Sequence, residues 1–129
     1  LVSLPAQPDV DAIRGVEGQA AALYFEAFGD MITVSTEDFA FKTRSRRPPR
    51  DRMNALLSFL YALLTTDCTA AAEGVGLDPQ IGFLHAVRPG RPSLALDLME
   101  EFRPVLAERL ALTLVNRRQI RPKHFDERD

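Results

Sequence analysis

The sequence predicts an all-α domain built from several long helices. Apolar residues recur at helical spacing in three segments, and each segment opens at a residue suited to cap a helix. A length of 129 residues suits one domain with its own hydrophobic core. Because no apolar run approaches the roughly 20 residues that a bilayer requires, we expect no membrane partner.

The first helix is expected to begin at Asp9 and to end near Phe28 or Met31. Glu17 lies in the middle of its apolar arc. An ionised carboxylate on a core-facing stripe is costly unless something pairs with it. The pattern therefore predicts that Glu17 faces either a bound ligand or a buried arginine, for which Arg50 and Arg103 are candidates.

A second helix is expected from Asp51 to Glu73, ending at Gly74, and its apolar surround predicts a buried central position. One stripe of this helix is polar and predicts either hydrogen bonds between helices or the border of a polar site: Asn54, Ser58, Tyr61, Thr65 and Cys68. Cys68 is the only cysteine, so the chain forms no internal disulfide, and we expect this thiol to be a packing residue. Before this helix, the alternating segment 39–42 predicts a short strand or the remnant of a β-hairpin.

A third long helix is expected to be capped by Ser93. Asp97 and Glu100 are three residues apart and lie together on the side opposite its apolar arc. Pro104 cannot donate a hydrogen bond to the carbonyl of Glu100, so the helix should kink or restart just beyond that carboxylate.

The sequence thus places carboxylates and one imidazole, His85, on three separate elements. Oxygen ligands suit Mg²⁺ or Mn²⁺, and an imidazole shifts the preference toward Mn²⁺. The chain has no HExxH, CxxC, P-loop or GxSxG motif. Glu17, His85 and the carboxylate pair of Asp97 and Glu100 are therefore compatible with a divalent-metal site, and spacing alone leaves buried pairs between glutamate and arginine as the alternative.

Arginine is unusually frequent relative to lysine, although the net charge is only −2. A basic cluster precedes the second helix, and further arginines flank His85 and Glu100. Guanidinium groups bind phosphate oxygens in a bidentate manner, so these residues are candidates for DNA contacts, with a solvated loop as the alternative. The candidates are Arg44, Arg46, Arg47, Arg50, Arg88, Arg91 and Arg103.

Three ordered motifs also resemble the CRISPR-associated integrase family, the endonuclease subunit of CRISPR adaptation. They read VEGQAAALYFEAF, RSRRPPRDRMNALLSFLYALL and GLDPQIGFLHAVRPGRPSLALDLMEEFRP, and the resemblance covers about residues 10–118. It implies that Glu17, His85 and Glu100 are catalytic and bind Mg²⁺ or Mn²⁺, and that Asp97 is a second catalytic acid of the last motif.

The resemblance implies the family's helical C-terminal catalytic domain over residues 1–129, with its C-terminal end incomplete and the N-terminal β-rich domain absent. The chain is therefore expected to be a piece of a longer protein. The implied activity is metal-dependent DNA cleavage and spacer insertion, in which a 3′-hydroxyl attacks a phosphodiester. The implied partners are spacer-precursor and repeat DNA, a second copy of the full-length protein, and the small second adaptation protein, in the cytoplasm.

Two other functions are compatible with the residues alone. A helical assembly module without catalysis would hold Glu17 and Glu100 in ion pairs with arginine. A phosphoesterase acting on small molecules would require a closed pocket rather than an open basic groove.

Overall fold

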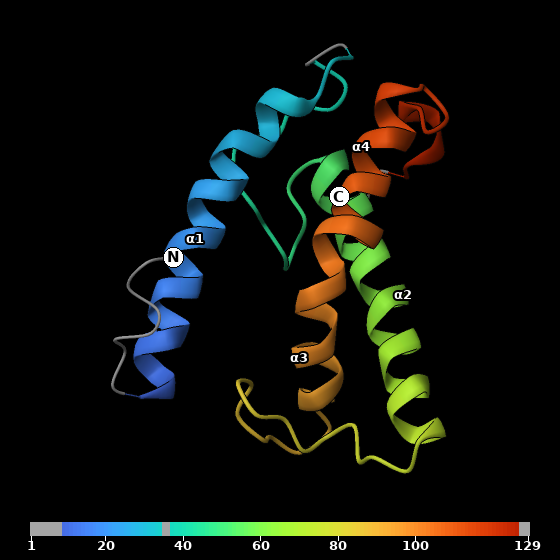
Figure 1. Cartoon of the computed structure of the whole chain (residues 1–129). Coiled ribbons are helices and arrows are strands. Elements are labelled where there is room, and N and C mark those ends of the chain that lie inside the picture. Colours follow the sequence, from blue (N-terminus) through green and yellow to red (C-terminus); the bar gives the residue numbers. More distant parts are fainter. Residues whose placement is uncertain (1–8, 35–36, 127–129) are drawn as a thin grey trace.

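The computed structural model describes residues 9–34 and 37–126, and these residues are helical with no β-strand. The all-α prediction is confirmed. The α-helices are α1 (Val10–Phe28), α2 (Arg52–Gly74), α3 (Ser93–Phe102) and α4 (Arg109–Asn116). Three short elements complete the order: the 3₁₀ helix η2 (Gly29–Met31), the π-helical segment η3 (Arg103–Glu108) and the 3₁₀ helix η4 (Pro122–His124). Figure 1 shows α1 standing beside the pair formed by α2 and α3.

The first two helices begin where the sequence predicts. The side chain of Asp9 accepts a hydrogen bond from the backbone N–H of Ala12 at 2.8 Å, and Asp51 accepts one from Asn54 at 2.7 Å. Each bond satisfies one of the backbone donors left free in the first turn of a helix.

The predicted cap at Ser93 is wrong. Pro92 is the N-cap residue of α3, and the Ser93 hydroxyl instead donates to the carbonyl of Ala86 at 3.0 Å. The hydroxyl therefore holds the preceding loop against α3 rather than closing the helix end.

The core is centred on α2, which packs along α3, η3 and α4. Met53 and Leu57 are completely buried, and Phe28 reaches the same core from α1. Ala95, Ala107 and Ala111 present small side chains to it, and small residues allow helices to approach closely. The predicted central position of α2 is confirmed, but the helix is not buried all round, because Phe59 and Leu63 on its other side are exposed.

The expected strand near residues 39–42 is absent from the described residues, although its aromatic residues are well packed. Phe39 is buried against the ring of Phe125, with ring centroids 5.9 Å apart, and Phe41 packs on Phe28 at 5.1 Å. A strand requires a neighbouring strand for its backbone hydrogen bonds, and the described segment has none. The alternating apolar positions instead place the rings of Phe39 and Phe41 in different parts of the core.

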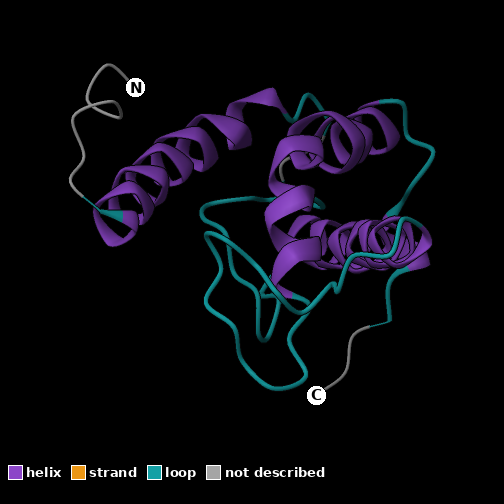
Figure 2. Cartoon of the chain, turned by 60° about the horizontal axis from the view of Figure 1, so that its bottom comes forward, coloured by secondary structure: helices purple, strands orange, loops and turns teal. Residues whose placement is uncertain are grey.

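Helix α1 is attached to the rest of the fold mainly through its C-terminal half. Its buried residues are Phe25 and Phe28, and its main close backbone contacts are with η2. Figure 2 shows the N-terminal half of α1 extending away from the other helices. The side chains of this half, including Glu17, are therefore exposed or only partly buried.

The predicted interruption at Pro104 is confirmed, and it takes the form of a π-helical segment. Pro104 lies at the start of η3, and α4 resumes at Arg109. Proline lacks the backbone N–H that an α-helix requires. A π-helical turn holds one residue more than an α-helical turn, so the chain passes the proline without leaving a helical path.

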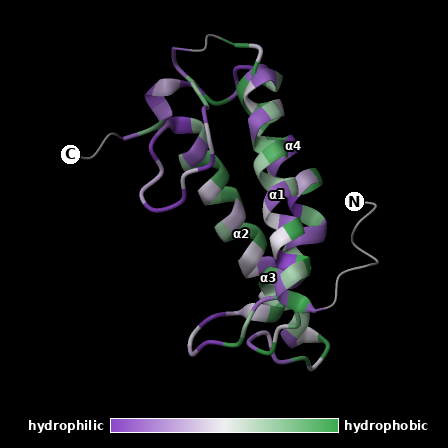
Figure 3. Ribbon diagram, turned by 90° about the vertical axis from the view of Figure 1, so that its left-hand side faces the viewer, coloured by the Kyte–Doolittle hydropathy of each residue, from purple (hydrophilic) through white to green (hydrophobic). Residues whose placement is uncertain are grey.

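Several large apolar side chains remain exposed on the helices, including Leu23, Phe59 and Val105. Figure 3 shows apolar and polar residues interleaved along the helices. By length and composition α2 is the one helix in the described ranges that could cross a membrane. Core helices of soluble proteins meet the same test, and one side of α2 lies in the core of this fold.

Candidate functional site

The loop that carries His85 is held in place by Asp97 of α3. One carboxylate oxygen accepts the backbone N–H groups of Phe83, at 2.5 Å, and Leu84, at 3.0 Å. The other accepts the N–H of His85 at 2.9 Å and lies 2.7 Å from its ring atom Nδ1. Burial opposes ionisation, but these hydrogen bonds outweigh it and lower the pKa of Asp97. Asp97 therefore fixes both the backbone and the ring of His85.

Gly82 allows this loop to lie close to α3. A β-carbon at this position would approach the Ser93 β-carbon to 2.6 Å and the carbonyl oxygen of His85 to 2.8 Å. Both distances are too short for any other residue without movement of the backbone.

Glu17 projects from the exposed N-terminal half of α1. No cation pairs with its carboxylate among the described residues, so the arginine partners considered from the sequence, Arg50 and Arg103, are not found there. Glu17 is therefore a carboxylate free to accept a ligand.

Glu100 lies on α3 and is half-buried. Its two carboxylate oxygens lie 3.0 and 2.9 Å from the same nitrogen, Nη1 of Arg103. Burial raises the pKa of Glu100 above its ordinary value, Arg103 opposes the shift, and the charge of Glu17 adds to it. The effect of Glu17 on Glu100 agrees with their placement around one cavity.

One cavity of about 490 Å³ lies between α1 and the arm formed by α3 and η3, and it brings together Glu17, His85 and Glu100. Its other lining residues are Ile13, Val16, Ala20, Ala21, Tyr24, Leu84, Glu101, Arg103, Pro104 and Glu108. We call it the Glu17 cavity. Within the described ranges no three acidic, histidine or cysteine side chains are gathered closely enough to hold a metal ion as they stand. The three residues thus line one cavity, but convergence at metal-ligand distance is not found among the described residues, and Glu100 faces a guanidinium as the ion-pair alternative predicted.

The chemistry of these donors fits a divalent metal ion. Glu17 is unpaired, and because Asp97 binds Nδ1 of His85, the Nε2 atom is the ring nitrogen left to a ligand. Like charges on Glu17 and Glu100 repel, which favours an open arrangement until a cation lies between them.

A second cavity of about 250 Å³ adjoins the first and is basic. Glu17 and His85 line it too, together with Arg14, Arg88 and Arg91. Nε of Arg14 donates to the carbonyl oxygen of Leu84 at 2.6 Å, and a second guanidinium nitrogen donates to the same oxygen. Arg14 was not predicted from the sequence, although it lies one helical turn before Glu17 and therefore on the same side of α1.

Asn54 organises the arginine-rich loop before α2. Fully buried, it donates to the carbonyl of Thr43 at 2.9 Å and accepts from Arg44 at 2.8 Å and from the N–H of Ser45 at 2.9 Å. Arg44 also donates to Ser58 and lies over the ring of Tyr61. The predicted hydrogen bonds between helices are therefore found for Tyr61 with Glu108 and for Thr65 with Met99, whereas the amino-terminal end of the stripe bonds to the loop.

The DNA-contact candidates fall into two groups. Five of them line either a loop cavity of about 600 Å³ or the basic cavity beside His85: Arg46, Arg47, Arg50 and Arg88, which are exposed, and Arg91, which is half-buried. Arg44 and Arg103 are instead engaged within the protein, the latter with only 13% of its side chain exposed.

Glu108 is a second residue of these cavities that was not predicted from the sequence. It is 1% exposed, lines the Glu17 cavity and contacts Arg103 and Tyr61.

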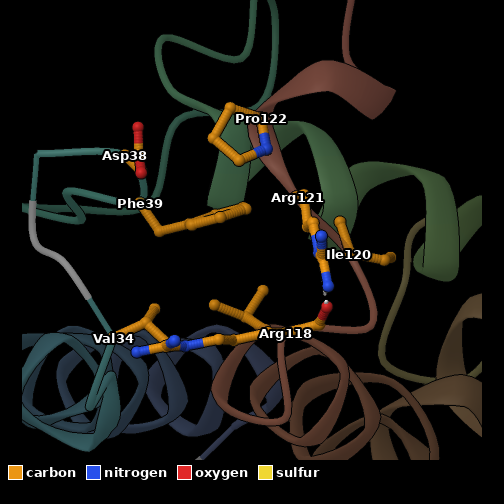
Figure 4. A pocket seen from close by; sticks show the side chains of 8 residues that line it. Val34, Asp38, Phe39, Arg118, Ile120, Arg121 and Pro122 are labelled. Carbon is orange, nitrogen blue, oxygen red and sulfur yellow. Dashed lines mark hydrogen bonds between the residues drawn. The ribbon is translucent and has the colours of Figure 1, made fainter.

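A further cavity, of about 360 Å³, shares no lining residue with the Glu17 cavity and lies between Phe39 and the segment after α4 (Figure 4).

Residues 1–129 match the family model described as CRISPR associated protein Cas1. The chain belongs to the Cas1 family. It is 63% identical over 128 residues to CRISPR-associated endonuclease Cas1 1 of Moorella thermoacetica, and 65% identical over 121 residues to CRISPR-associated endonuclease Cas1 2 of Rhodospirillum rubrum. These matches cover 99% and 94% of this chain but only 37% and 35% of the two relatives.

Solved structures agree with the Cas1 assignment. A Cas1 protein from Thermotoga maritima superposes with a TM-score of 0.89 at 40% identity, over 98% of this chain and 40% of that one. A casposase bound to integration product superposes with a TM-score of 0.90 at 31% identity, over all of this chain and 36% of that one. The fold described above is therefore one that other Cas1 proteins contain as part of a longer chain.

Proposed function

We propose that this Cas1 chain forms the catalytic part of a DNA endonuclease and integrase of CRISPR adaptation that depends on Mg²⁺ or Mn²⁺. One observation carries the proposal: Glu17, His85 and Glu100, from three separate elements, line a single cavity. The printed names of the relatives support it, since they are endonucleases, and a similar fold occurs in a casposase bound to integration product.

Glu17, His85 and Glu100 would hold the divalent ion. When bound, the ion would stabilise negative charge on the phosphoryl oxygens as a DNA 3′-hydroxyl attacks the phosphodiester, or as water attacks in the nuclease reaction. Glu17 supplies a free carboxylate and His85 supplies Nε2. Asp97 serves this site by holding His85 in one orientation, since it accepts hydrogen bonds from the ring and from the loop backbone.

The basic cavity beside His85 is the proposed path of the DNA backbone. Arg88 and Arg91 line it together with Glu17 and His85, so a phosphate held there lies next to the proposed metal site. Exposed Arg46, Arg47 and Arg50 would extend the phosphate contacts along the loop before α2. Arg44 and Arg103, also candidates from the sequence, would reach DNA only by giving up their present partners.

The partners follow from the same proposal. DNA of the spacer precursor and the CRISPR repeat would be the substrates, and a similar fold is found in a Cas6-RT-Cas1--Cas2 complex, with a TM-score of 0.84 and 31% identity over 95% of this chain and 13% of that one. A second Cas1 copy and the small adaptation protein Cas2 would complete the assembly, in the cytoplasm.

Mn²⁺ binding measured by calorimetry tests this proposal. The unaltered chain should bind one ion, and Glu17→Ala, His85→Ala and Glu100→Ala should each weaken binding at least tenfold. Glu26→Ala, which removes an exposed carboxylate of the same helix, is the matched control and should bind like the unaltered chain. No binding, or equal binding by all variants, would contradict the metal site.

The assembly module without catalysis remains the second candidate function, because Arg103 pairs with both Glu100 and Glu108. In that case Glu100→Gln should lower the free energy of unfolding while Mn²⁺ has no effect on any variant. The unpaired carboxylate of Glu17 favours the metal-dependent function over this one.

A further inference from the structure

Glu108 is a buried charged residue whose purpose is not explained by packing. Only 1% of it is exposed, yet it lines the Glu17 cavity. Its Oε1 atom accepts a hydrogen bond from the hydroxyl of Tyr61 at 2.5 Å and lies 3.0 Å from Nε of Arg103. Its Oε2 atom is buried and makes no hydrogen bond of ordinary geometry in the described part of the chain. The hydroxyl of Tyr24 also interacts with this carboxylate, which together with burial raises the pKa of Tyr24. A buried carboxylate is costly, so a site that retains one uses its charge.

The π-helical segment explains how Glu108 reaches Arg103. The two residues are five positions apart, and in an α-helix they would point about 140° away from each other around the axis. The wider turn of a π-helix brings residues five apart toward the same side. Pro104 therefore has a consequence beyond the kink, since the irregular turn beside it creates the contact between Arg103 and Glu108.

Arg103 is shared between two glutamates. Its Nη1 atom binds both carboxylate oxygens of Glu100, while its Nε atom lies against Glu108. The guanidinium also lies over the ring of Tyr61, 5.4 Å from the ring centre. Burial, together with the hydrogen bond to Glu108, raises the pKa of Tyr61, so its hydroxyl stays protonated and donates. Glu108 and the ring of Tyr61 thus hold one side of the Arg103 guanidinium in place, and its Nη1 atom on the other side orients Glu100.

The charges around the cavity show what Glu108 contributes. The acidic residues that line it, Glu17, Glu100, Glu101 and Glu108, together with Arg103 carry a net charge of −3. Without Glu108 the net charge would be −2, because Arg103 would cancel Glu100. Glu17 and Glu101 are exposed, so solvent screens their charges more than the charge of buried Glu108.

We propose that Glu108 is a positioning residue of the metal site: it neutralises Arg103, so that Arg103 orients Glu100 without cancelling the negative charge that attracts the divalent cation. This inference rests on the proposed function, because it presumes that the Glu17 cavity binds the ion.

Calorimetric titration of the chain with Mn²⁺ tests the inference through three variants. Glu108→Gln keeps the shape and one acceptor oxygen but removes the charge, and it should weaken Mn²⁺ binding at least tenfold. Adding Arg103→Gln restores the original net charge but removes the group that orients Glu100, so this double variant should lose some affinity yet bind less than tenfold more weakly than the unaltered chain. Glu26→Gln removes the same unit charge from an exposed residue of α1 that does not line the cavity, and it should change the affinity less than twofold. Circular dichroism and thermal unfolding establish that each variant is folded.

Each other result overturns the inference. Unchanged affinity in Glu108→Gln would show that its charge does not serve the site. A double variant as weak as Glu108→Gln would show that charge balance is not the cause, and an equal loss in Glu26→Gln would show that any negative charge on these helices has the same effect. If Glu108→Gln does not fold, the double variant, which buries no unpaired charge, decides alone, because a tenfold or greater loss of affinity in it overturns the inference. A folded, unaltered chain that binds no Mn²⁺ would refute the proposed function itself, whereas binding lost in Glu17→Ala but kept in Glu108→Gln would refute this inference alone.

Discussion

The Nδ1 atom of His85 lies 2.7 Å from Oδ1 of Asp97, and the same carboxylate receives three backbone N–H groups from the loop that carries the histidine. Asp97 is thus the anchor of the loop 83–85 on α3. The bond to Nδ1 leaves Nε2 of His85 to face a ligand, an arrangement common among metal-binding histidines.

Asp97→Ala should release this loop. Hydrogen bonds to a charged acceptor contribute about 2 kcal/mol, so the free energy of unfolding should fall by roughly that amount. Mn²⁺ affinity should fall at least tenfold as well, because His85 loses its fixed orientation. Urea unfolding and calorimetry measure the two effects, and Asp30→Ala, an exposed aspartate, is the control. A variant with normal stability and normal affinity would show that the loop holds its shape without Asp97.

Arg14→Ala should separate α1 from the His85 loop. The guanidinium donates two hydrogen bonds to the carbonyl of Leu84, and the N-terminal half of α1 has no buried residue to replace them. We expect a several-fold loss of Mn²⁺ affinity with unchanged helix content by circular dichroism, because Glu17 moves with α1. Asp11→Ala removes only the ion pair of Arg14 at the surface, where Asp11 is 87% exposed, and should have no effect. Equal effects of the two substitutions would contradict this role of Arg14.

Asn54→Ala should destabilise the chain by about 3 kcal/mol, because it leaves several buried polar groups without partners. Asn54 is fully buried and bonds to Thr43, Arg44 and Ser45 of the arginine-rich loop. The substitution should also weaken binding to a short DNA duplex, measured by fluorescence anisotropy at low salt. Thr66→Ala, which removes an exposed hydroxyl of the same helix, is the control. Normal DNA affinity in a folded Asn54 variant would show that the loop needs no such support.

Cys68 should react slowly with a thiol reagent in the folded protein. Burial raises the pKa of its thiol, so less of the reactive thiolate forms at pH 8 than in a free cysteine. Labelling by Ellman's reagent should accelerate at least a hundredfold in denaturant. Rapid labelling of the native protein would mean that α2 is not packed at this position as described.

The helices themselves were largely predictable from the sequence. The caps at Asp9 and Asp51 and the break at Pro104 depend on local backbone chemistry, which neighbouring residues determine. Failures arose where a residue bonds outside its own element. Ser93 has the composition of a cap, but the carbonyl of Ala86 takes its hydroxyl.

The sequence by itself determined which helices form and that Glu17, His85 and Glu100 carry the chemistry suited to a divalent metal. Only the tertiary structure decided their partners. Arg14 meets Leu84 across 70 residues of sequence, and Tyr61 meets Glu108 across 47. Helical periodicity reports which side of one helix a residue occupies, but not which residue of another element faces it. The partners of Arg103 depend in addition on an irregular turn, because a π-helical segment places Glu108 where an ideal helix would not.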